Sequence, residues 1–195
     1  MKLTPEQERT LLKLAKLSIL HGFESGRPLP LTHPEVEAVT DALLWQDGAA
    51  FVTLNKRQSL RGCIGSIQAY RPLIEDVIHH AFDAAFKDPR FPPLLPEEVS
   101  DLTIEISVLT PPVRMENCQT YEDLLQQLQP GKDGLILTDG VHQANFLPTV
   151  WEQLPDKTQF VLHLMQKAGM QSWSPHMQCY RYHTLSFEAE WVEIE

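Results

Sequence analysis

The sequence predicts an α+β protein, in which helices flank a mostly antiparallel or mixed sheet. Two observations lead to this prediction. Apolar stretches with the two-residue period of β-strands come as hairpins, at 49–67 and again at 135–147. Stretches with the period of amphipathic helices lie between these hairpins and do not alternate strictly with single strands. The 195 residues suffice for a single domain with a sizeable apolar core.

The first half of the chain begins with a clear helix start. Thr4 offers a capping hydroxyl, Pro5 occupies the first helical position and Gln7 is placed to reach back. This helix is predicted to end at His21-Gly22. The other elements predicted here are a loop over 26–34, a helix over 34–45, a hairpin of strands 49–55 and 60–67, and a helix that opens at Pro72.

The second half contains the most regular strand pattern of the chain. Leu102–Val108 alternates throughout, so one face belongs to the core and the other carries Thr103, Glu105 and Ser107. Glu105 is a candidate general base if that face lines a cleft, and a solvated edge residue otherwise. The other elements predicted here are a helix over 120–128, a hairpin of strands 135–138 and 141–147, a helix over 156–169, and a strand over 179–191 that closes the sheet.

The charge and hydropathy of the sequence argue against nucleic-acid and membrane partners. The 16 basic and 26 acidic residues give a net charge of −10, so the average surface repels phosphate backbones and nucleic acid is not an expected partner. The first residues hold no apolar run of signal-peptide length, and no segment approaches the roughly 18 apolar residues of a membrane helix. We therefore expect no membrane partner and a cytoplasmic location.

The cysteines argue against a disulfide framework and against a metal site. Three cysteines at wide spacings fit a reducing compartment. The nearest approach to a ligand cluster is His176, Cys179 and His183. Two ligands four residues apart on a strand are separated by about 13 Å, too far to share one metal ion. No metal site is predicted, and no cofactor is indicated.

The most informative motif is Leu60-Arg61-Gly62-Cys63-Ile64-Gly65. On a strand, Arg61, Cys63 and Gly65 share one face, and same-face neighbours lie roughly 6.6 Å apart. The Arg61 guanidinium would then reach the sulfur and favour its thiolate form, while Gly65 places no side chain beside it. Such a thiol is a candidate seat for a small ligand or an acyl group. The alternative is a buried, inert cysteine beside glycines that serve packing.

A proline-rich corner follows the third predicted helix, at Asp88-Pro89-Arg90-Phe91-Pro92-Pro93. Proline fixes the backbone there, which would present Arg90 as a preorganised ligand for an anion with Asp88 as its orienting partner. The alternative is a rigid corner in which Asp88 and Arg90 serve only the fold.

These motifs resemble those of the AMMECR domain family. The resemblance rests on Leu60–Gly65, on Ala84–Pro93 and on Glu105–Thr110, and it continues through segments 134–137, 146–151 and 167–169. It implies an α+β fold with a larger and a smaller subdomain, at a boundary that the sequence does not give. Bacterial members are known as protein A of the AmmeMemoRadiSam system, which implies association with a Memo-like protein and a radical-SAM protein in a modification pathway.

Two hypotheses on function remain open at this point. In the first, the protein is an enzyme: Cys63 is a nucleophile or covalent carrier favoured by Arg61, Arg90 binds an anionic group of the substrate, and Glu105 is the base. In the second, it is a non-catalytic ligand-binding or adaptor module. The glycines of the motif, Gly62 and Gly65, then let a small ligand or a partner's backbone approach the sheet, and Cys63 fills space.

Overall fold

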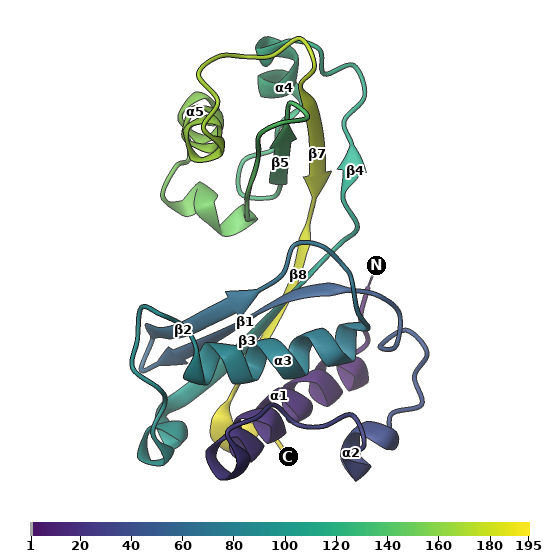
Figure 1. Ribbon diagram of the computed structural model, residues 1–195, viewed down its shortest axis with the longest axis vertical. Helices are drawn as coiled ribbons and strands as arrows, with labels where there is room; N and C mark the ends of the chain where they lie inside the picture. The colour runs from purple at the N-terminus through teal and green to yellow at the C-terminus, as the bar shows by residue number, and fades with distance from the viewer. Residues whose placement is uncertain (1) are drawn as a thin grey trace. The chain divides into compact units, whose positions relative to one another are not determined.

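The computed structural model describes residues 2–195, which fold into two compact units (Figure 1). The larger unit contains the chain up to Leu109 together with Leu185–Glu195, and the smaller contains Thr110–Thr184. Each unit has its own four-stranded sheet and its own helices. The predicted α+β class is confirmed, although the strands form two sheets where the sequence suggested one.

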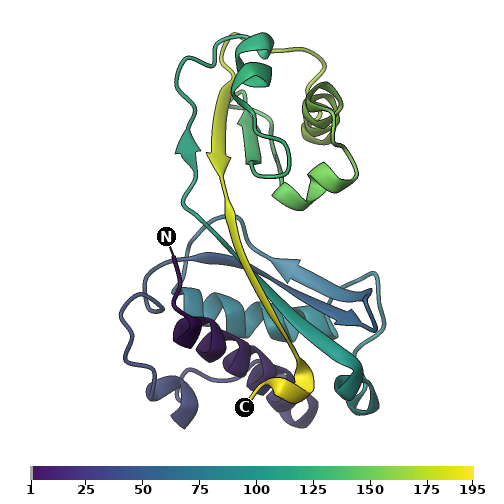
Figure 2. The same ribbon diagram turned by 180° about the vertical axis from the view of Figure 1, so that it is seen from behind.

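The sheet of the larger unit has the strand order β2-β1-β3-β8, which leaves β2 at an edge. Two long helices, α1 and α3, cover one face of it, as Figures 1 and 2 show. Val52, Leu54, Ile104 and Ile106 point into the core beneath these helices and are fully buried. The bounds are β1 (Ala49–Lys56), β2 (Ser59–Gly65), β3 (Leu102–Leu109), β8 (Thr184–Glu190), α1 (Pro5–Ser25), α3 (Leu73–Phe86) and the short 3-10 helices η1 (Pro96–Asp101) and η3 (Trp191–Glu193).

Helix α1 begins as predicted and ends later than predicted. The Thr4 hydroxyl accepts the Gln7 N–H at 3.3 Å, and the Gln7 side chain accepts the Thr4 N–H at 2.8 Å. The helix passes through Gly22 and stops at Gly26, whose φ of +69° suits a left-handed cap. A Cβ at Gly22 would lie 2.4 Å from the Phe86 ring, so this glycine serves the close packing of α1 on α3.

The predicted helix over 34–45 is wrong in length, because α2 covers only Pro34–Glu37. Asp41 supplies the reason. Its carboxylate accepts the Leu43 N–H at 2.9 Å and the Gln7 side-chain amide at 2.7 Å. A side chain that bonds the nearby backbone in this way competes with the helical ladder.

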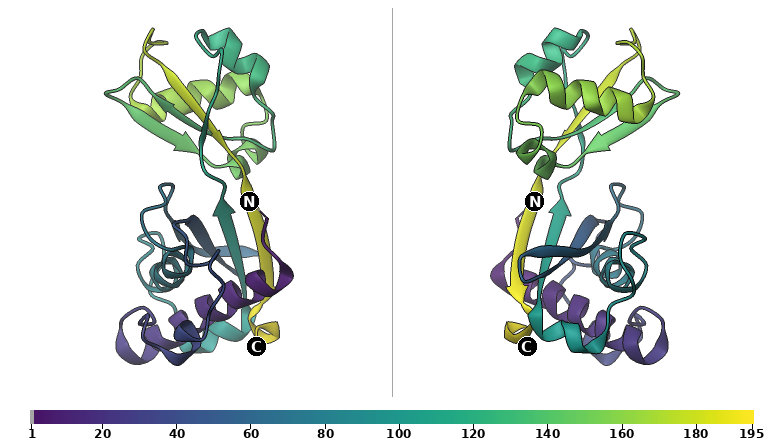
Figure 3. Two further views of the ribbon diagram at one scale, coloured as in Figure 1. Left: turned by 90° about the vertical axis from the view of Figure 1, so that its right-hand side faces the viewer. Right: turned by 90° about the vertical axis from the view of Figure 1, so that its left-hand side faces the viewer.

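The sheet of the smaller unit has the strand order β4-β7-β5-β6, and Figure 3 shows α5 lying across it. The Trp151 ring stacks on Phe160 in its core, with centroids 3.7 Å apart. The bounds are β4 (Val113–Arg114), β5 (Gly134–Thr138), β6 (Gln143–Phe146), β7 (Gln178–Tyr182), α4 (Tyr121–Gln127), α5 (Lys157–Ala168) and the 3-10 helix η2 (Pro148–Glu152).

The single strand predicted over 179–191 is two strands in different sheets. Tyr182 of β7 pairs with Gly134 of β5, whereas Ser186 of β8 bonds Ser107 of β3 at 2.7 Å between hydroxyl oxygens. The alternation changes phase between the strands, because the tyrosines of β7 lie at even positions and the apolar residues of β8 lie at odd positions. No helix within residues 2–195 is both long enough and apolar enough to cross a membrane.

Candidate functional site

Cys63 lies on the face of the larger unit's sheet that is opposite α1 and α3, which we call the open face. Its strand partner is Thr53, whose hydroxyl donates to the Cys63 Sγ at 3.3 Å. Thr53 sits between the core residues Val52 and Leu54, and so points away from the helices. Thr53 is in turn paired with Glu105 on β3, so Cys63, Thr53 and Glu105 form a row across three strands. Cys63 itself is only half-buried.

Arg61 does not lie beside the Cys63 sulfur, so that prediction is wrong. The pairing of β1 with β2 passes from Leu54–Gly62 to Asn55–Leu60, which makes Arg61 the extra residue of a β-bulge. The bulge breaks the two-residue alternation and turns the Arg61 side chain to Glu98. Its Nε and Nη2 donate to the two Glu98 carboxylate oxygens at 3.1 and 2.9 Å, and its Nη1 donates to the Pro92 carbonyl at 3.0 Å.

Glu98 is the centre of a partly buried ionic cluster that the sequence did not predict. Besides the two hydrogen bonds from Arg61, the Glu98 carboxylate accepts a hydrogen bond from Lys56 Nζ at 2.8 Å. These bonds lower the Glu98 pKa to about 2, and the bond from Arg61 has the largest effect. The burial of the carboxylate opposes this shift. The cluster ties strands β1 and β2 to η1, and Arg61 therefore serves the fold.

Asp88 and Arg90 hold both polar backbone groups of Cys63. An Asp88 carboxylate oxygen accepts the Cys63 N–H at 2.9 Å, and Arg90 Nη2 donates to the Cys63 carbonyl at 3.2 Å. The two side chains also form a bidentate pair, with Nε–Oδ1 at 3.0 Å and Nη2–Oδ2 at 2.7 Å. Asp88 thus orients Arg90 as the sequence predicts. Because β2 is an edge strand, this corner occupies backbone groups that no other strand pairs.

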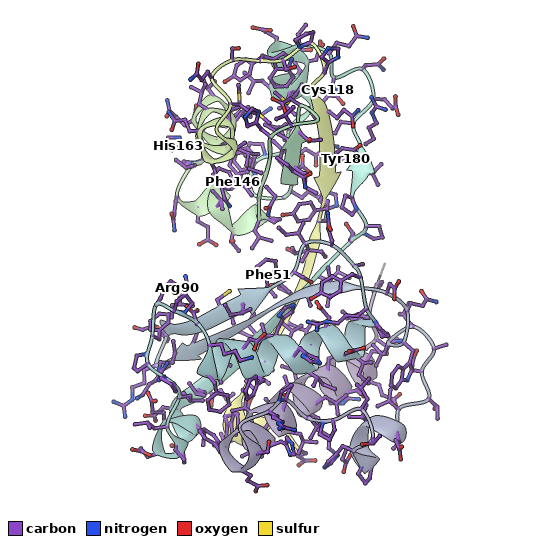
Figure 4. The ribbon with its side chains drawn as sticks, viewed as in Figure 1. Phe51, Arg90, Cys118, Phe146, His163 and Tyr180 are labelled. Atoms are coloured by element: carbon purple, nitrogen blue, oxygen red, sulfur yellow. The ribbon has the colours of Figure 1, made fainter. Side chains whose placement is uncertain are left out.

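The Asp88–Arg90 pair is ionised and partly open to solvent. The hydrogen bond from Arg90 holds the Asp88 pKa well below its usual range, against the opposing effect of burial. The same bond raises the Arg90 pKa, and the proximity of Cys63 adds to this. The Arg90 side chain is 53% exposed while that of Asp88 is 2% exposed. Figure 4 shows Arg90 on the loop that follows α3, next to β2. Arg90 is therefore the accessible cation beside Cys63.

The two glycines of the motif make room for the protein itself. A Cβ at Gly62 would lie 2.1 Å from the Ala84 carbonyl oxygen of α3. A Cβ at Gly65 would lie 2.3 Å from the ring of Phe51, a residue labelled in Figure 4. The position beside Cys63 that the sequence suggested was empty is filled by this ring. Any binding role of Gly62 and Gly65 rests on their backbone groups.

A cavity of about 610 Å³ opens on the same sheet, within the usual size range of small-molecule sites. Asn55 and Thr103 line it, and they are the same-face neighbours of Thr53 and Glu105 two residues along their strands. Cys63 and Arg90 do not line it. The other lining residues are Gln58, Glu188, Ala189, Glu190 and Glu193.

A second buried ionic group, also missed from the sequence, lies at the start of α3. The fully buried Asp76 carboxylate accepts Ser66 Oγ at 2.9 Å and Arg71 Nε at 2.8 Å, and lies 3.1 Å from His80 Nε2. Burial, the largest effect, raises the Asp76 pKa, but the bonds from His80, Ala50 and Arg71 together lower it. The group anchors the segment directly after the cysteine motif. The only sequence signal for it is the i,i+4 spacing of Asp76 and His80.

Comparison with known proteins identifies the family. The AMMECR1 family model matches residues 12–187, which include the cysteine motif and the Asp88–Arg90 corner. The chain belongs to the AMMECR1 family. Protein TK0174 of Thermococcus kodakarensis is an AMMECR1-like relative 38% identical over 192 residues, covering 93% of this chain and 89% of its own. Protein MK0488 of Methanopyrus kandleri is 36% identical over 196 residues, covering 97% and 91%.

A solved AMMECR1-like structure has the same fold. The crystal structure of the uncharacterized protein PH0010 from Pyrococcus horikoshii superposes with a TM-score of 0.79 at 32% identity, covering 97% of this chain and 95% of that one. The family predicted from the motifs is therefore confirmed. Within residues 2–195, no group of three or more His, Cys, Asp or Glu side chains is placed to hold a metal ion.

Proposed function

We propose that this AMMECR1-family protein is an enzyme in which Cys63 acts as a nucleophile or covalent carrier. The observation that carries the proposal is a half-exposed thiol whose position is fixed from three sides. Thr53 donates to the sulfur, Asp88 accepts the backbone N–H, and Arg90 donates to the carbonyl. A nucleophile held in this way loses little freedom when a substrate binds.

The neighbouring side chains take distinct roles in this proposal. Arg90, exposed and oriented by Asp88, binds an anionic group of the substrate. Glu105 is the proposed base, and it belongs to the second strand away from Cys63. Strands two apart are separated by about 10 Å, so Glu105 acts on the substrate and Thr53 is the group that contacts the sulfur. Arg61 takes no part, because its donors are committed to Glu98 and the Pro92 carbonyl.

The proposed setting is a modification pathway. A covalent carrier must receive its group from one partner and deliver it to another, and we propose a Memo-like protein and a radical-SAM protein for these roles. The small-molecule ligand would be the group that Cys63 carries. The support for these partners is the resemblance of the motifs to the bacterial AmmeMemoRadiSam proteins.

Genetic complementation tests the enzyme proposal. A strain that lacks its own AMMECR1-family gene is supplied with wild type, Cys63→Ala or Cys118→Ala, and the fold of each protein is checked by circular dichroism. We expect Cys63→Ala to fold and to fail, since the nucleophile is absent, and Cys118→Ala to complement. Full activity of Cys63→Ala would overturn the proposal.

The second candidate is a non-catalytic ligand-binding or adaptor module, and one observation favours it. The 610 Å³ cavity of the open face is lined by neither Cys63 nor Arg90. If this candidate is right, the Cys63→Ala protein still complements the deletion strain. The Thr103→Trp protein, in which the new side chain fills the cavity, does not. Co-elution with the Memo-like or the radical-SAM protein should then be lost in Thr103→Trp as well. Absence of co-elution and of any ligand in the wild type would remove this candidate.

A further inference from the structure

The smaller unit contains two cysteines whose thiols are in direct contact. Cys118, in the loop after β4, and Cys179, on β7, are 61 positions apart in the sequence, yet their sulfur atoms are 3.3 Å apart. Both are free thiols. A disulfide bond has an S–S distance of about 2 Å, so a shift of little more than 1 Å would join them.

The pair borders a cavity through which a small reagent can reach it. This cavity of about 550 Å³ is lined by both cysteines and by Met177, Gln119 and Arg114 among others. Met115 donates its N–H to the Cys179 carbonyl at 2.9 Å, which continues the pairing of β4 with β7 and keeps Cys179 in a regular strand. Cys118 is 8% exposed and Cys179 only 1%. Cys118 is therefore the more accessible sulfur.

The two thiols also differ in acidity. The hydrogen bond between the two sulfur atoms lowers the Cys118 pKa, and burial opposes this effect only in part. The same hydrogen bond and burial raise the Cys179 pKa. Of the two contacting thiols, Cys118 is therefore the one that ionises first. A low-pKa thiol next to a protonated partner is the arrangement of an attacking and a resolving cysteine.

We propose that Cys118 and Cys179 form a reversible dithiol–disulfide site that exchanges with small disulfides such as oxidised glutathione. The Cys118 thiolate attacks one sulfur of the disulfide, forms a mixed disulfide and releases one glutathione thiolate. Cys179 then loses its proton and attacks the Cys118 sulfur, which forms the Cys118–Cys179 bond and releases the second glutathione. Two protein thiols are oxidised and one glutathione disulfide is reduced. This site is separate from Cys63 and does not depend on the function proposed for it.

Oxidation would stabilise the smaller unit. The new bond closes a loop that contains α4, β5, β6 and α5, which is most of the unit. A covalent link between residues so far apart in the sequence restricts the unfolded chain more than the folded one. We expect the melting temperature of the unit to rise by several degrees, on the order of that produced by other long-loop disulfides.

Equilibration in glutathione redox buffers tests the proposal. The Cys63→Ala protein is incubated at a series of ratios of reduced to oxidised glutathione, quenched with acid, unfolded, alkylated and analysed by mass spectrometry. We expect a two-thiol transition with the loss of two hydrogen atoms and a Cys118–Cys179 linked peptide. Alkylation of both cysteines at every ratio would overturn the proposal, as would oxidation that yields only links between molecules.

Two further variants test the assigned roles. Without Cys179 to resolve it, a mixed disulfide with glutathione should persist on Cys118 in Cys179→Ala. In Cys118→Ala, Cys179 should acquire no adduct, because it is buried and protonated. An adduct on Cys179 with none on Cys118 would contradict the proposed order of attack. Circular dichroism of each variant confirms that the unit is folded.

Discussion

Two arginine–carboxylate pairs flank the cysteine strand, and their arginines differ in exposure. Arg61 bonds Glu98 and Arg90 bonds Asp88, each through Nε and Nη2 to two carboxylate oxygens. Both guanidinium groups also lie near the Phe91 ring, at 5.9 and 5.6 Å from its centroid. The Arg61 side chain is 11% exposed and that of Arg90 is 53% exposed. The same chemistry therefore supports the fold at Arg61 and presents an accessible, paired cation at Arg90.

Breaking the buried pair should have the largest effect on stability. Glu98→Ala leaves Arg61 and Lys56 without their carboxylate, and we expect the free energy of unfolding to fall by about 3–5 kcal/mol. Asp101→Ala is the matched control, because it breaks a pair whose Arg57 side chain is 78% exposed and should cost less than about 1 kcal/mol. Urea denaturation measures both. Equal losses in the two variants would contradict the difference in burial.

Lowering the pH should remove the stabilisation that the Glu98 cluster provides. The pKa of Glu98 is lowered from 4.5 to about 2 on folding, so its stabilisation is present above pH 4.5 and is lost as the pH falls towards 2. The shift corresponds to about 3 kcal/mol, and Asp88 acts in the same direction at lower pH. The pH dependence of urea denaturation over this window should flatten in Glu98→Gln. An unchanged slope would show that other carboxylates cause the acid loss.

Asp88→Asn tests the pair whose arginine is the more exposed. Asparagine keeps an oxygen for the Cys63 N–H but sets an amide against Arg90, so we expect a loss of about 2 kcal/mol, less than for Glu98→Ala. Hydrogen exchange of the Cys63 amide should also accelerate, since its acceptor is weakened. If the exchange rate does not change while stability falls, Asp88 does not hold this backbone group.

The smallest effect on stability is expected at Thr53. Thr53→Val removes the hydroxyl that donates to Cys63 Sγ while keeping the β-branched shape, and should cost less than about 1 kcal/mol. Alkylation of Cys63 by iodoacetamide at neutral pH should slow by a factor of about three, because a donor to the negative sulfur is lost. Peptide-level mass spectrometry measures the rate. A faster reaction would show that Thr53 shields the sulfur.

The features that the sequence predicted are those decided within a few residues. The Thr4 cap of α1 and the Asp88–Arg90 corner are local, as is the strand character of Leu60–Gly65. Arg61 was misplaced because a bulge is decided by the pairing of β2 with β1. The Phe51 ring over Gly65 is likewise a cross-strand contact.

Most longer-range features had no sequence signal. The change of sheet after Tyr182 has one that the prediction of a single strand overlooked: the alternation moves from tyrosines at even positions to apolar residues at odd positions across His183-Thr184. The contact of Cys118 with Cys179 joins residues 61 positions apart. Glu98 is charged and lies in a polar segment, so its burial beneath Arg61 follows only from the fold.

The most direct test of an anion-binding role for Arg90 beside Cys63 compares charged and neutral alkylation of this thiol. The rates with iodoacetate and iodoacetamide are measured in wild type, in Arg90→Ala and in Arg57→Ala, which removes the same charge from the nearby hairpin turn. If Arg90 binds anions beside the thiol, the ratio of the iodoacetate rate to the iodoacetamide rate should fall about fivefold in Arg90→Ala alone, equivalent to about 1 kcal/mol, the attraction between unit charges about 4 Å apart in bulk water. An unchanged ratio would show that Arg90 binds no anion beside the thiol, and a Cys63 that reacts only after unfolding would exclude it as a nucleophile.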